Sequence, residues 1–401
     1  MLTRSRLTSV SAALAALLAA AALSACGSDD SSSATAAGGA TGAATTAASS
    51  DAGGGVEAAK ALVAEASETP RFVAPPAFDT AAAEGKTVWW IGNVEDPILR
   101  QWVEAAREAW EANGAELRVY DTKGSIPEHV KGFDLAIAGK ADAIVLGDGF
   151  PAVQFAAQVK RAKDAGIPFF SLVTGQPREQ PEVDGLALDV SYDYRRVGQL
   201  LAAWAIADSD GTAQGVFIET PAIPSSTFER EGFQREIEAN CPDCRFEYKE
   251  VEQTGGGSSA QDALGNVART SILSNPKTGY VITAFDSQAL YAMAGVQQAG
   301  AGTRVKLAGF NTIVPQMQNL KKGTPFKMDV GGPNVWLGYA LADNVMREWA
   351  GEELVEDPQI GFKLFTEENV QDLNVDREDG TEWYGVDYGE LFRRDVWGLE
   401  K

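Results

Sequence analysis

Histidine and cysteine are scarce in this chain: it has one histidine and three cysteines among 401 residues. A single histidine excludes a metal site built from several histidines and a histidine-based catalytic triad of the usual form. His129 follows the segment GSIPE near an expected helix start, so we expect a surface side chain. The sequence also lacks G-x-G-x-x-G after its first strand, the phosphate loop G-x-x-x-x-G-K-[ST] and the nucleophile elbow G-x-S-x-G. We therefore predict no enzyme activity, no cofactor and no metal.

Positive charge is also limited, because 34 Lys and Arg stand against 56 Asp and Glu and give a formal net charge of −22. A strongly acidic protein is repelled by the phosphates of nucleic acids and by anionic lipid headgroups. No long apolar run follows the first 25 residues. We expect no nucleic-acid partner and a soluble folded body.

The first residues have the composition of a secretion signal. Arg4 and Arg6 precede an Ala- and Leu-rich run that ends at Leu23-Ser24-Ala25-Cys26. A basic start, a short apolar core and small residues before a cleavage point are typical of a signal peptide. The ending resembles a bacterial lipobox, which predicts a signal peptide over 1–25 and acyl chains on Cys26 that anchor the protein to the cell membrane. An ordinary signal peptide with a chance cysteine is the alternative.

The next segment has nothing to bury, because residues 27–55 are all Gly, Ser, Asp, Ala or Thr. We predict a flexible tether over 26–55. Residues 56–85 form an N-terminal extension, in which RFVAPPAF either lies along the surface of the folded body or continues the linker.

From Lys86 onward, strand-like and helix-like segments alternate. TVWWIGN (87–93) predicts a buried strand, and Asp96-Pro97 begins a helix with Asp as the N-cap and Pro in the first turn. Strands separated by helices of about 10 to 15 residues indicate parallel sheets with right-handed crossovers. Two successive arrays of similar size predict an α/β fold of two Rossmann-like domains. Ligands of such sheets bind beyond the carboxyl ends of the strands, here in the cleft between the domains.

Five stretches carry a more specific likeness. They are KADAIVLGDGFPAVQFAAQVKRAKDAGIPFFSL, FEREGFQREIEA, TAFDSQALYAMAGVQQAG, RVKLAGFNT and GGPNVWLGYALADNVMREWAGEE. Together and in this order they resemble the type I (ribose/galactose) periplasmic binding proteins, the sugar-binding lipoproteins of bacterial ABC importers, over roughly residues 86–373. The resemblance implies an extracytoplasmic monomer that closes on a small solute by hinge motion and delivers it to an ABC permease in the membrane. A sugar or sugar-like solute is the first expectation.

The resemblance also implies a three-segment hinge. The crossings are expected near Val173-Thr174, Val330-Gly331 and Gln359-Gly361. The expected parts are an N-terminal lobe of 86–173 plus 331–359, a C-terminal lobe of 174–330 plus 360–375, and a C-terminal tail of 376–401. Packing of the aromatic tail against the second lobe is a hypothesis.

Ligand contacts are carried over from the family position by position. They are Asn93, Glu95, Asp96, Ile98, Asp148, Phe150, Thr174, Phe228, Arg230, Phe285, Asp286, Asn311, Asn334 and Trp336. Ile98 stands where sugar binders usually have an aromatic residue, Thr174 where they often have Asp-Arg, and Asn311 where they usually have Asp. These departures predict a cleft with fewer charged groups and more apolar lining. Asp286 as a helix cap and Trp336 as a core residue are the structural alternatives.

Other functions share parts of this pattern. A receptor that reports ligand occupancy to a membrane sensor has the same fold, and the solute is alternatively a less polar metabolite than a sugar. A tethered enzyme requires a nucleophile and base that the sequence does not offer. A repressor of this fold requires a helix-turn-helix before the first strand, where the tether stands.

With Cys26 assigned to lipid, Cys241 and Cys244 remain as a C-x-x-C pair. An oxidising compartment favours a disulfide, and zinc requires two further ligands. A redox C-x-x-C usually begins a helix, whereas this one follows a predicted helix. We predict a disulfide that closes the turn.

Overall fold

The computed structural model describes residues 52–252, 258–377 and 380–399. The predicted signal peptide, Cys26 and almost all of the predicted tether lie outside the described residues.

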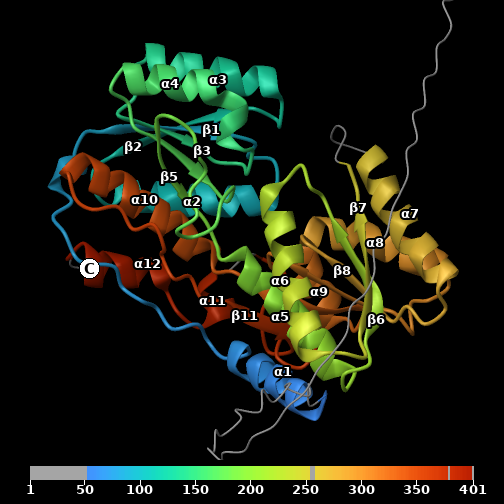
Figure 1. Cartoon of the computed structure of the whole chain (residues 1–401). Coiled ribbons are helices and arrows are strands. Elements are labelled where there is room, and N and C mark those ends of the chain that lie inside the picture. The colour runs from blue at the N-terminus through green and yellow to red at the C-terminus, as the bar shows by residue number, and fades with distance from the viewer. Residues whose placement is uncertain (1–51, 253–257, 378–379, 400–401) are drawn as a thin grey trace, which may run out of the picture. The chain divides into compact units, whose positions relative to one another are not determined.

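The first sheet has five parallel strands in the order β2-β1-β3-β4-β5. Helices α3 and α4 cover one face, and α2 and α10 cover the other (Figure 1). The strands are β1 (Thr87–Gly92), β2 (Glu116–Asp121), β3 (Ala143–Leu146), β4 (Phe169–Leu172) and β5 (Leu186–Val190). The helices are α2 (Pro97–Glu111), α3 (Ile126–Ala138), α4 (Ala156–Asp164) and α10 (Asn334–Ala350), with a 3-10 turn (Ala152–Phe155) before α4.

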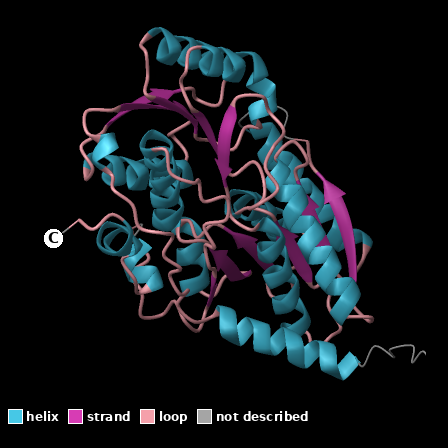
Figure 2. Ribbon diagram, turned by 60° about the vertical axis from the view of Figure 1, so that its left-hand side comes forward, coloured by secondary structure: helices cyan, strands magenta, loops and turns pink. Residues whose placement is uncertain are grey.

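The second sheet has six strands in the order β11-β10-β9-β8-β6-β7, and all pair in parallel except the antiparallel pair β10–β11. The strands are β6 (Gln214–Glu219), β7 (Arg245–Glu250), β8 (Tyr280–Thr283), β9 (Lys306–Phe310), β10 (Phe326–Gly331) and β11 (Lys363–Thr366). The helices are α5 (Tyr194–Asp208), α6 (Pro224–Asn240), α7 (Ser258–Ser274), α8 (Asp286–Gln298) and α9 (Val314–Lys321). Helices enclose the strands of both sheets (Figure 2), which confirms the predicted α/β class with two mostly parallel sheets.

Local sequence signals account for the positions of several elements. Asp96 is the N-cap of α2, because its carboxylate accepts the Ile98 N–H, and Pro97 occupies the first turn. This capping confirms the predicted helix start. The core of each lobe follows from the same pattern: Val88 and Trp90 of β1 are fully buried toward α2 and α10, whereas Ile91 packs with Phe133 toward α3 and α4.

The pairing of β5 corrects the expected first crossing. The expected boundary at Val173-Thr174 places residues 186–190 in the second lobe. In the structure, β5 pairs with β4 and completes the first sheet. The chain reaches the second lobe only with α5. The boundary was misplaced because β4 and β5 are joined by a loop instead of a helix, so the alternation of elements gives no signal there.

Both terminal segments are part of the folded body. Helix α1 (Ala52–Ala66) packs against α5 and α6, so the tether predicted to extend to Gly55 ends earlier. Residues 67–80 then cross to α10, where Phe72 lies with its ring centroid 5.0 Å from that of Trp336. RFVAPPAF therefore lies along the folded body, the first of the two predicted alternatives.

The C-terminal tail contacts both lobes. It contains α11 (Gly380–Tyr384), α12 (Tyr388–Leu391) and a π-helical turn (Phe392–Val396). Tyr384 packs its ring against Phe365 of β11, whereas Tyr388 stacks on Trp336 and Trp397 stacks on Tyr339, both of α10. The tail therefore packs against the second lobe, as hypothesised, and also against α10 of the first.

The two terminal segments also bond to each other. The Thr69 hydroxyl donates to the Tyr384 carbonyl at 2.9 Å, and the Tyr388 hydroxyl donates to the Pro70 carbonyl at 2.9 Å. They form one layer that spans the two lobes on the side of α10.

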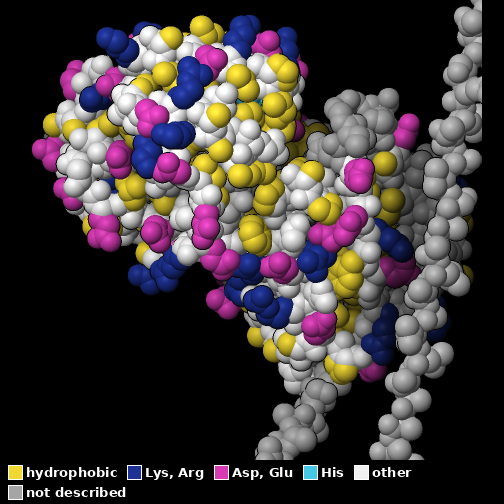
Figure 3. Space-filling view, turned by 45° about the horizontal axis from the view of Figure 1, so that its top comes forward, with side chains coloured by type: hydrophobic (Ala, Val, Ile, Leu, Met, Phe, Trp, Pro, Cys, Tyr) yellow, Lys and Arg dark blue, Asp and Glu magenta, His cyan; other side chains and the backbone are white. Residues whose placement is uncertain are grey.

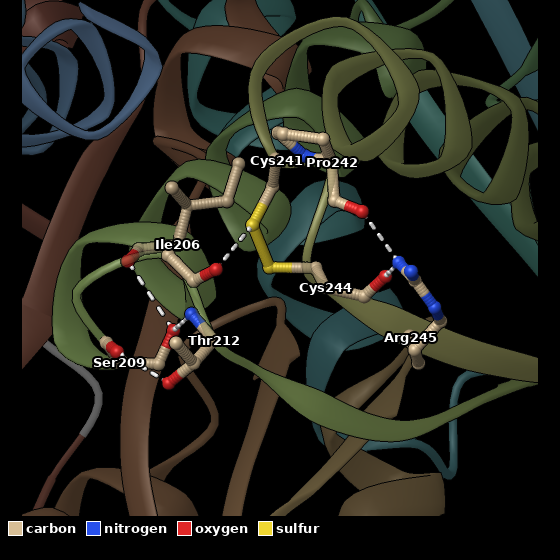
Figure 4. The surroundings of a disulfide bond; sticks show 8 residues. Ile206, Ser209, Thr212, Cys241, Pro242, Cys244 and Arg245 are labelled. Carbon is tan, nitrogen blue, oxygen red and sulfur yellow. Dashed lines mark hydrogen bonds between the residues drawn. A yellow bond between two sulfur atoms is a disulfide. The ribbon is translucent and has the colours of Figure 1, made fainter. Parts of the chain in front are cut away.

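The predicted disulfide is present. Cys241 and Cys244 are bonded in the turn between α6 and β7 (Figure 4). Both cysteines are buried, and the Arg245 guanidinium closes the same turn by donating to the Pro242 and Cys244 carbonyls at 2.6 Å each. The pair lies at the amino end of β7, the edge of the sheet opposite to the strand ends where ligands of such folds bind.

None of the helices within the described part of the chain is long and apolar enough to span a bilayer.

Candidate functional site

The candidate site consists of the loops that follow the carboxyl ends of the strands in both sheets. In the first sheet these loops follow β1, β3 and β4, and in the second they follow β6, β8 and β9. We call them the strand-end loops. Four of their non-glycine residues have positive φ angles: Val173 at 59°, Arg178 at 65°, Asn311 at 132° and Thr312 at 59°. Such strained backbone persists only where the surroundings fix it, and it is frequent at ligand sites.

The loop after β1 is held by its own polar groups and by Asp148 of the loop after β3. The Asn93 N–H donates to Asp148 at 2.8 Å, and the Asn93 side-chain oxygen accepts the Glu95 N–H at 2.9 Å. The Glu95 side chain is exposed, Asp96 caps α2, and Ile98 is buried. Of the predicted residues in this loop, Asn93, Glu95 and Asp96 therefore keep some exposure to solvent.

Asp148 and His129 form a buried pair, which corrects the expectation that His129 is a surface residue. The His129 Nε2 lies 2.9 Å from Asp148 Oδ2, and the two side chains are 0% and 1% exposed. The helix α3 turns its imidazole inward against Phe155 and Phe150, with ring centroids 5.1 and 5.0 Å away. The Asp148 side chain thus faces the interior, whereas Phe150, two residues later in the same loop, is half-buried.

Thr174 is engaged by a second buried carboxylate, Asp189. The Thr174 hydroxyl donates to Asp189 Oδ1 at 2.7 Å, and the Gly175 N–H donates to Oδ2 at 2.9 Å. Ser171 donates to the same carboxylate at 2.6 Å. Asp189 lies at the end of β5, so its bonds fix the loop that follows β4 from the neighbouring strand.

On the second sheet, an ion pair orients Arg230. The Arg230 Nε lies 3.0 Å from a carboxylate oxygen of Glu219 at the end of β6, and the Arg230 side chain keeps 24% of its surface exposed. Burial raises the pKa of Glu219, and the charge of Arg230 opposes that rise. Phe228, two residues before Arg230 on α6, is half-buried with the Arg195 guanidinium 4.9 Å from its ring centroid.

Asp286 is fully buried beside Asp329 of β10. Its Oδ2 accepts the Ile313 N–H at 3.0 Å, so it ties the start of α8 to the loop after β9. Burial raises the pKa of both carboxyls, and that of Asp329 is raised further by the charge of Asp286. Phe285 precedes this pair and is half-buried. Asn311 lies in the loop after β9, and its side-chain oxygen has no hydrogen-bond partner in the described structure.

Asn334 and Trp336 of α10 lie inside the protein. The Asn334 oxygen accepts from the Trp102 indole at 2.7 Å and from the Tyr192 hydroxyl at 3.0 Å, and its amide donates to Gln101 at 2.9 Å. Trp336 is fully buried between Phe72 and Tyr388. Of the two alternatives for Trp336, the structure shows the core residue, because the two terminal segments cover it.

The predicted ligand set therefore divides into two groups. Asp148, Thr174, Asp286 and Asn334 are buried and bonded within the protein, and Ile98 and Trp336 are buried as well. The side chains that keep some exposure are Asn93, Glu95, Asp96, Phe150, Phe285 and Asn311 of the strand-end loops and Phe228 and Arg230 of α6. Three of these eight are phenylalanines, which fits the predicted apolar lining. Elsewhere, charged and hydrophobic side chains are interspersed over the face drawn in Figure 3.

Sequence reasoning missed the buried acids that organise the site. Asp189, Asp329 and Glu229 are each at most 1% exposed, and burial raises the pKa of Glu229 well above its usual range. A carboxylate inside an apolar strand, as in LALDV and FKMDVG, is the signal that would have identified Asp189 and Asp329. Within the described residues, no cluster of acidic, histidine or cysteine side chains has the arrangement of a metal site.

Two of the cavities in the described part of the chain are lined by the N-terminal extension. A cavity of about 140 Å³ lies between residues 73–76 and α10. A second cavity, of about 550 Å³, lies between residues 65–71, the start of α5 and residues 357–362. Both involve the N-terminal extension, so they belong to the terminal layer.

Comparison with known proteins agrees with this architecture. The family model described as periplasmic binding protein domain matches residues 89–353. A sugar ABC transporter subunit from Rhodobacter sphaeroides superposes with a TM-score of 0.60 at 19% identity, covering 71% of this chain and 99% of that one. A solute-binding protein from Actinobacillus succinogenes with bound D-allose gives 0.59 at 18% identity, with 71% and 99% covered.

A Caulobacter myo-inositol binding protein gives a TM-score of 0.60 at 16% identity, covering 74% of this chain and 96% of that one. The comparison with curated proteins gave no match. These structures share the fold, and the matched model spans well over half of the sequence. The chain belongs to the periplasmic binding protein domain family.

Proposed function

We propose that this protein is an extracytoplasmic solute-binding protein that captures a sugar or sugar-like solute between its lobes and delivers it to an ABC permease. The observation that carries the proposal is that the strand-end loops of both sheets, together with the first turns of α6, present half-buried aromatic and polar side chains. Structural neighbours at this level of identity include proteins with bound D-allose and bound myo-inositol.

The side chains divide the recognition of a polyhydroxylated ring between them. Phe150, Phe228 and Phe285 offer apolar surface to the C–H faces of the ring, since ligand sites are mostly apolar with a few placed polar groups. Asn93, Asn311 and Arg230 offer hydrogen bonds to hydroxyls. Glu219 holds the Arg230 guanidinium in place before the ligand arrives, so less side-chain entropy is lost on binding.

Closure of the two lobes then removes the ligand from water. A ligand that contacts both sheets stabilises the closed arrangement by its differential affinity for that arrangement. The permease is expected to recognise the closed form. The buried acids below the loops act as fixed supports in this motion, and we propose no turnover of the bound solute.

We further propose that acyl chains on Cys26 anchor the protein to the cell membrane and that the chain acts as a monomer. The lipobox-like sequence and the family support the anchor, and the disulfide between Cys241 and Cys244 fits an oxidising compartment. Metabolic labelling with an alkyne-bearing fatty acid should mark the wild type and leave Cys26→Ser unlabelled. Labelling of both would contradict the assignment.

Mass spectrometry of small molecules released from the purified protein is the most direct test. We expect a released polyol or sugar, and a rise in melting temperature when it is added back, because ligand binds only the folded state. At a concentration one hundred times Kd the stabilisation is about 2.7 kcal/mol. Phe285→Ala should remove most of this rise, whereas Leu273→Ala, an exposed residue of α7, should keep it. Absence of any response across sugars, polyols and small acids would overturn the proposal.

A further inference from the structure

Both ring nitrogens of the single histidine lie within hydrogen-bond distance of an oxygen atom. His129 is fully buried, its Nδ1 lies 2.8 Å from the Ser125 carbonyl oxygen, and its Nε2 lies 2.9 Å from Asp148 Oδ2. A carbonyl oxygen only accepts, so Nδ1 must carry a hydrogen. The second nitrogen faces a carboxyl oxygen, and one more proton is needed between them for a hydrogen bond.

Asp148 is at the same time the anchor of the loop after β1. Its Oδ2 accepts the Asn93 N–H at 2.8 Å, and the Thr122 hydroxyl lies 3.5 Å from the same oxygen. The Asn93 side chain in turn accepts the Glu95 N–H at 2.9 Å. The backbone approaches closely here: a Cβ added at Gly92 would lie 3.2 Å from the Asp148 Cβ. Any movement of the Asp148 carboxylate therefore reaches Asn93 directly.

The imidazole also supports Phe150. Its ring contacts Phe150 edge-on at 5.0 Å and stacks on Phe155 at 5.1 Å, with Phe133 at 6.4 Å. Phe150 and Asn93 are two of the side chains in the proposed ligand set. Both are thus positioned by the same buried pair, one through packing and one through a hydrogen bond.

We propose that His129 and Asp148 hold one proton between Nε2 and Oδ2, and that this protonated pair positions Asn93 and Phe150 for solute binding. His129 is a positioning residue in this scheme, since it acts through its neighbours. The inference rests on the proposed solute-binding function of the strand-end loops. Loss of the shared proton leaves a lone pair of Nε2 against the Asp148 carboxylate, and the two groups then separate.

The charged groups around the ring are few. On α3 itself, Glu128 accepts from the Tyr120 hydroxyl and pairs with Lys131, so both are directed away from the imidazole. From β2 and its following loop, Asp121 accepts the Lys123 N–H. The loop after β3 and the 3-10 turn before α4 contribute the uncharged residues Phe150 and Phe155. Asp148 is the charged group that faces the ring within the described residues.

Burial opposes the charged imidazole, but the hydrogen bond and charge of Asp148, together with the Ser125 carbonyl, raise the His129 pKa above its usual value. The imidazole therefore keeps its proton to a higher pH than a free histidine does, and the pair is lost as the pH rises through the folded-state pKa. Solute affinity is expected to fall in the same alkaline range. A change of one pH unit beyond the pKa changes the protonated fraction about tenfold.

Two measurements test the inference. Because His129 is the only histidine in the sequence, its imidazole resonances can be followed without ambiguity by NMR in the wild type, together with the Asn93 amide. The second measurement is calorimetric binding of D-allose and myo-inositol between pH 6 and pH 9. We expect the Asn93 amide to shift with the imidazole titration and affinity to fall about tenfold at the alkaline end.

Three variants separate the causes. His129→Asn should bind more weakly than the wild type at pH 6 and lose the alkaline decrease. Asp148→Asn keeps the shape, stabilises the neutral imidazole and should shift its titration to lower pH, so it tests the pair if His129→Asn does not fold. Glu128→Gln, a neighbouring titratable residue on the same helix, should keep the wild-type pH profile.

The outcomes distinguish this inference from the function on which it rests. If neither probe binds at any pH, the sugar assignment fails, and the Asn93 amide still decides the coupling. An imidazole that titrates at or below its usual value, or an Asn93 amide that does not follow the titration, would overturn the inference. Unchanged affinity across the imidazole titration would overturn it as well.

Discussion

Replacement of Asp343 by alanine should strongly destabilise the protein. Asp343 and Arg347 form an ion pair one turn apart on α10, with Arg347 Nε 2.6 Å from Asp343 Oδ2 and side chains 1% and 3% exposed, respectively. The pair also fastens both terminal segments. The Trp397 indole donates to Asp343 Oδ1 at 2.8 Å, Arg347 donates to the Pro76 carbonyl, and its guanidinium lies 4.4 Å from the Phe78 ring centroid.

The size of the decrease in stability follows from the unpaired charge that the substitution leaves buried. Without Asp343, the Arg347 guanidinium stays buried without its counter-charge, and removal of one partner of a buried pair costs about 3–5 kcal/mol. Loss of the bond from Trp397 adds about 1 kcal/mol. Since domains are stable by only about 5–15 kcal/mol, we expect a large decrease in the free energy of unfolding.

Urea unfolding, followed by tryptophan fluorescence and circular dichroism, measures the effect. Asp343→Ala with Arg347→Met removes both charges and should recover most of the loss, because a well-packed apolar pair often replaces a buried ion pair without cost. Trp397→Phe isolates the indole bond and should cost about 1 kcal/mol plus a small packing change. If Asp343→Ala lies within about 1 kcal/mol of the wild type, or the double variant is less stable than the single one, the reasoning is refuted.

Three further predictions concern other parts of the fold. Cys241→Ser with Cys244→Ser should lower the free energy of unfolding by about 2 kcal/mol, the entropy of so short a loop, and should leave solute binding unchanged. A matching loss in the wild type upon reduction is expected, and no loss in either would contradict it. Gly198→Ala should destabilise by about 1–3 kcal/mol or more, because its Cβ would lie 1.8 Å from the Glu229 carbonyl oxygen of the packed helix α6. Gly279→Ala, with no neighbour of the added Cβ nearer than 3.8 Å, is the thermal-denaturation control, and equal melting temperatures would exclude the clash. Burial raises the pKa values of Asp286 and Asp329, so the folded state binds more protons than the unfolded chain and stability should fall as the pH rises above their unfolded values. Asp329→Asn should reduce this fall in a pH series of urea midpoints, and an unchanged slope would show that the pair does not titrate as inferred.

Much of the architecture is determined by local sequence. The alternation of strands and helices, the start of α2 at Asp96-Pro97 and the position of the disulfide after α6 follow from periodicity, capping and spacing. Such signals act between residues that are close in the sequence, so they do not depend on distant segments. The half-buried Phe150 and Phe285 also follow from this level, because a residue just past a parallel strand lies at the carboxyl edge of the sheet.

The remaining features depend on segments that are distant in sequence. Trp336 is a core residue because Phe72 and Tyr388, from the two ends of the chain, cover it. His129 is buried because Asp148 offers a carboxylate below α3, and β5 joins the first sheet because β4 offers it an edge. The sequence by itself determined the elements, their order and the edge of the sheets where we propose that a ligand binds. Only the tertiary structure decided which polar side chains at that edge are buried and hydrogen-bonded within the protein. Burial and pairing depend on partners that are distant in the sequence, and no local pattern contains them.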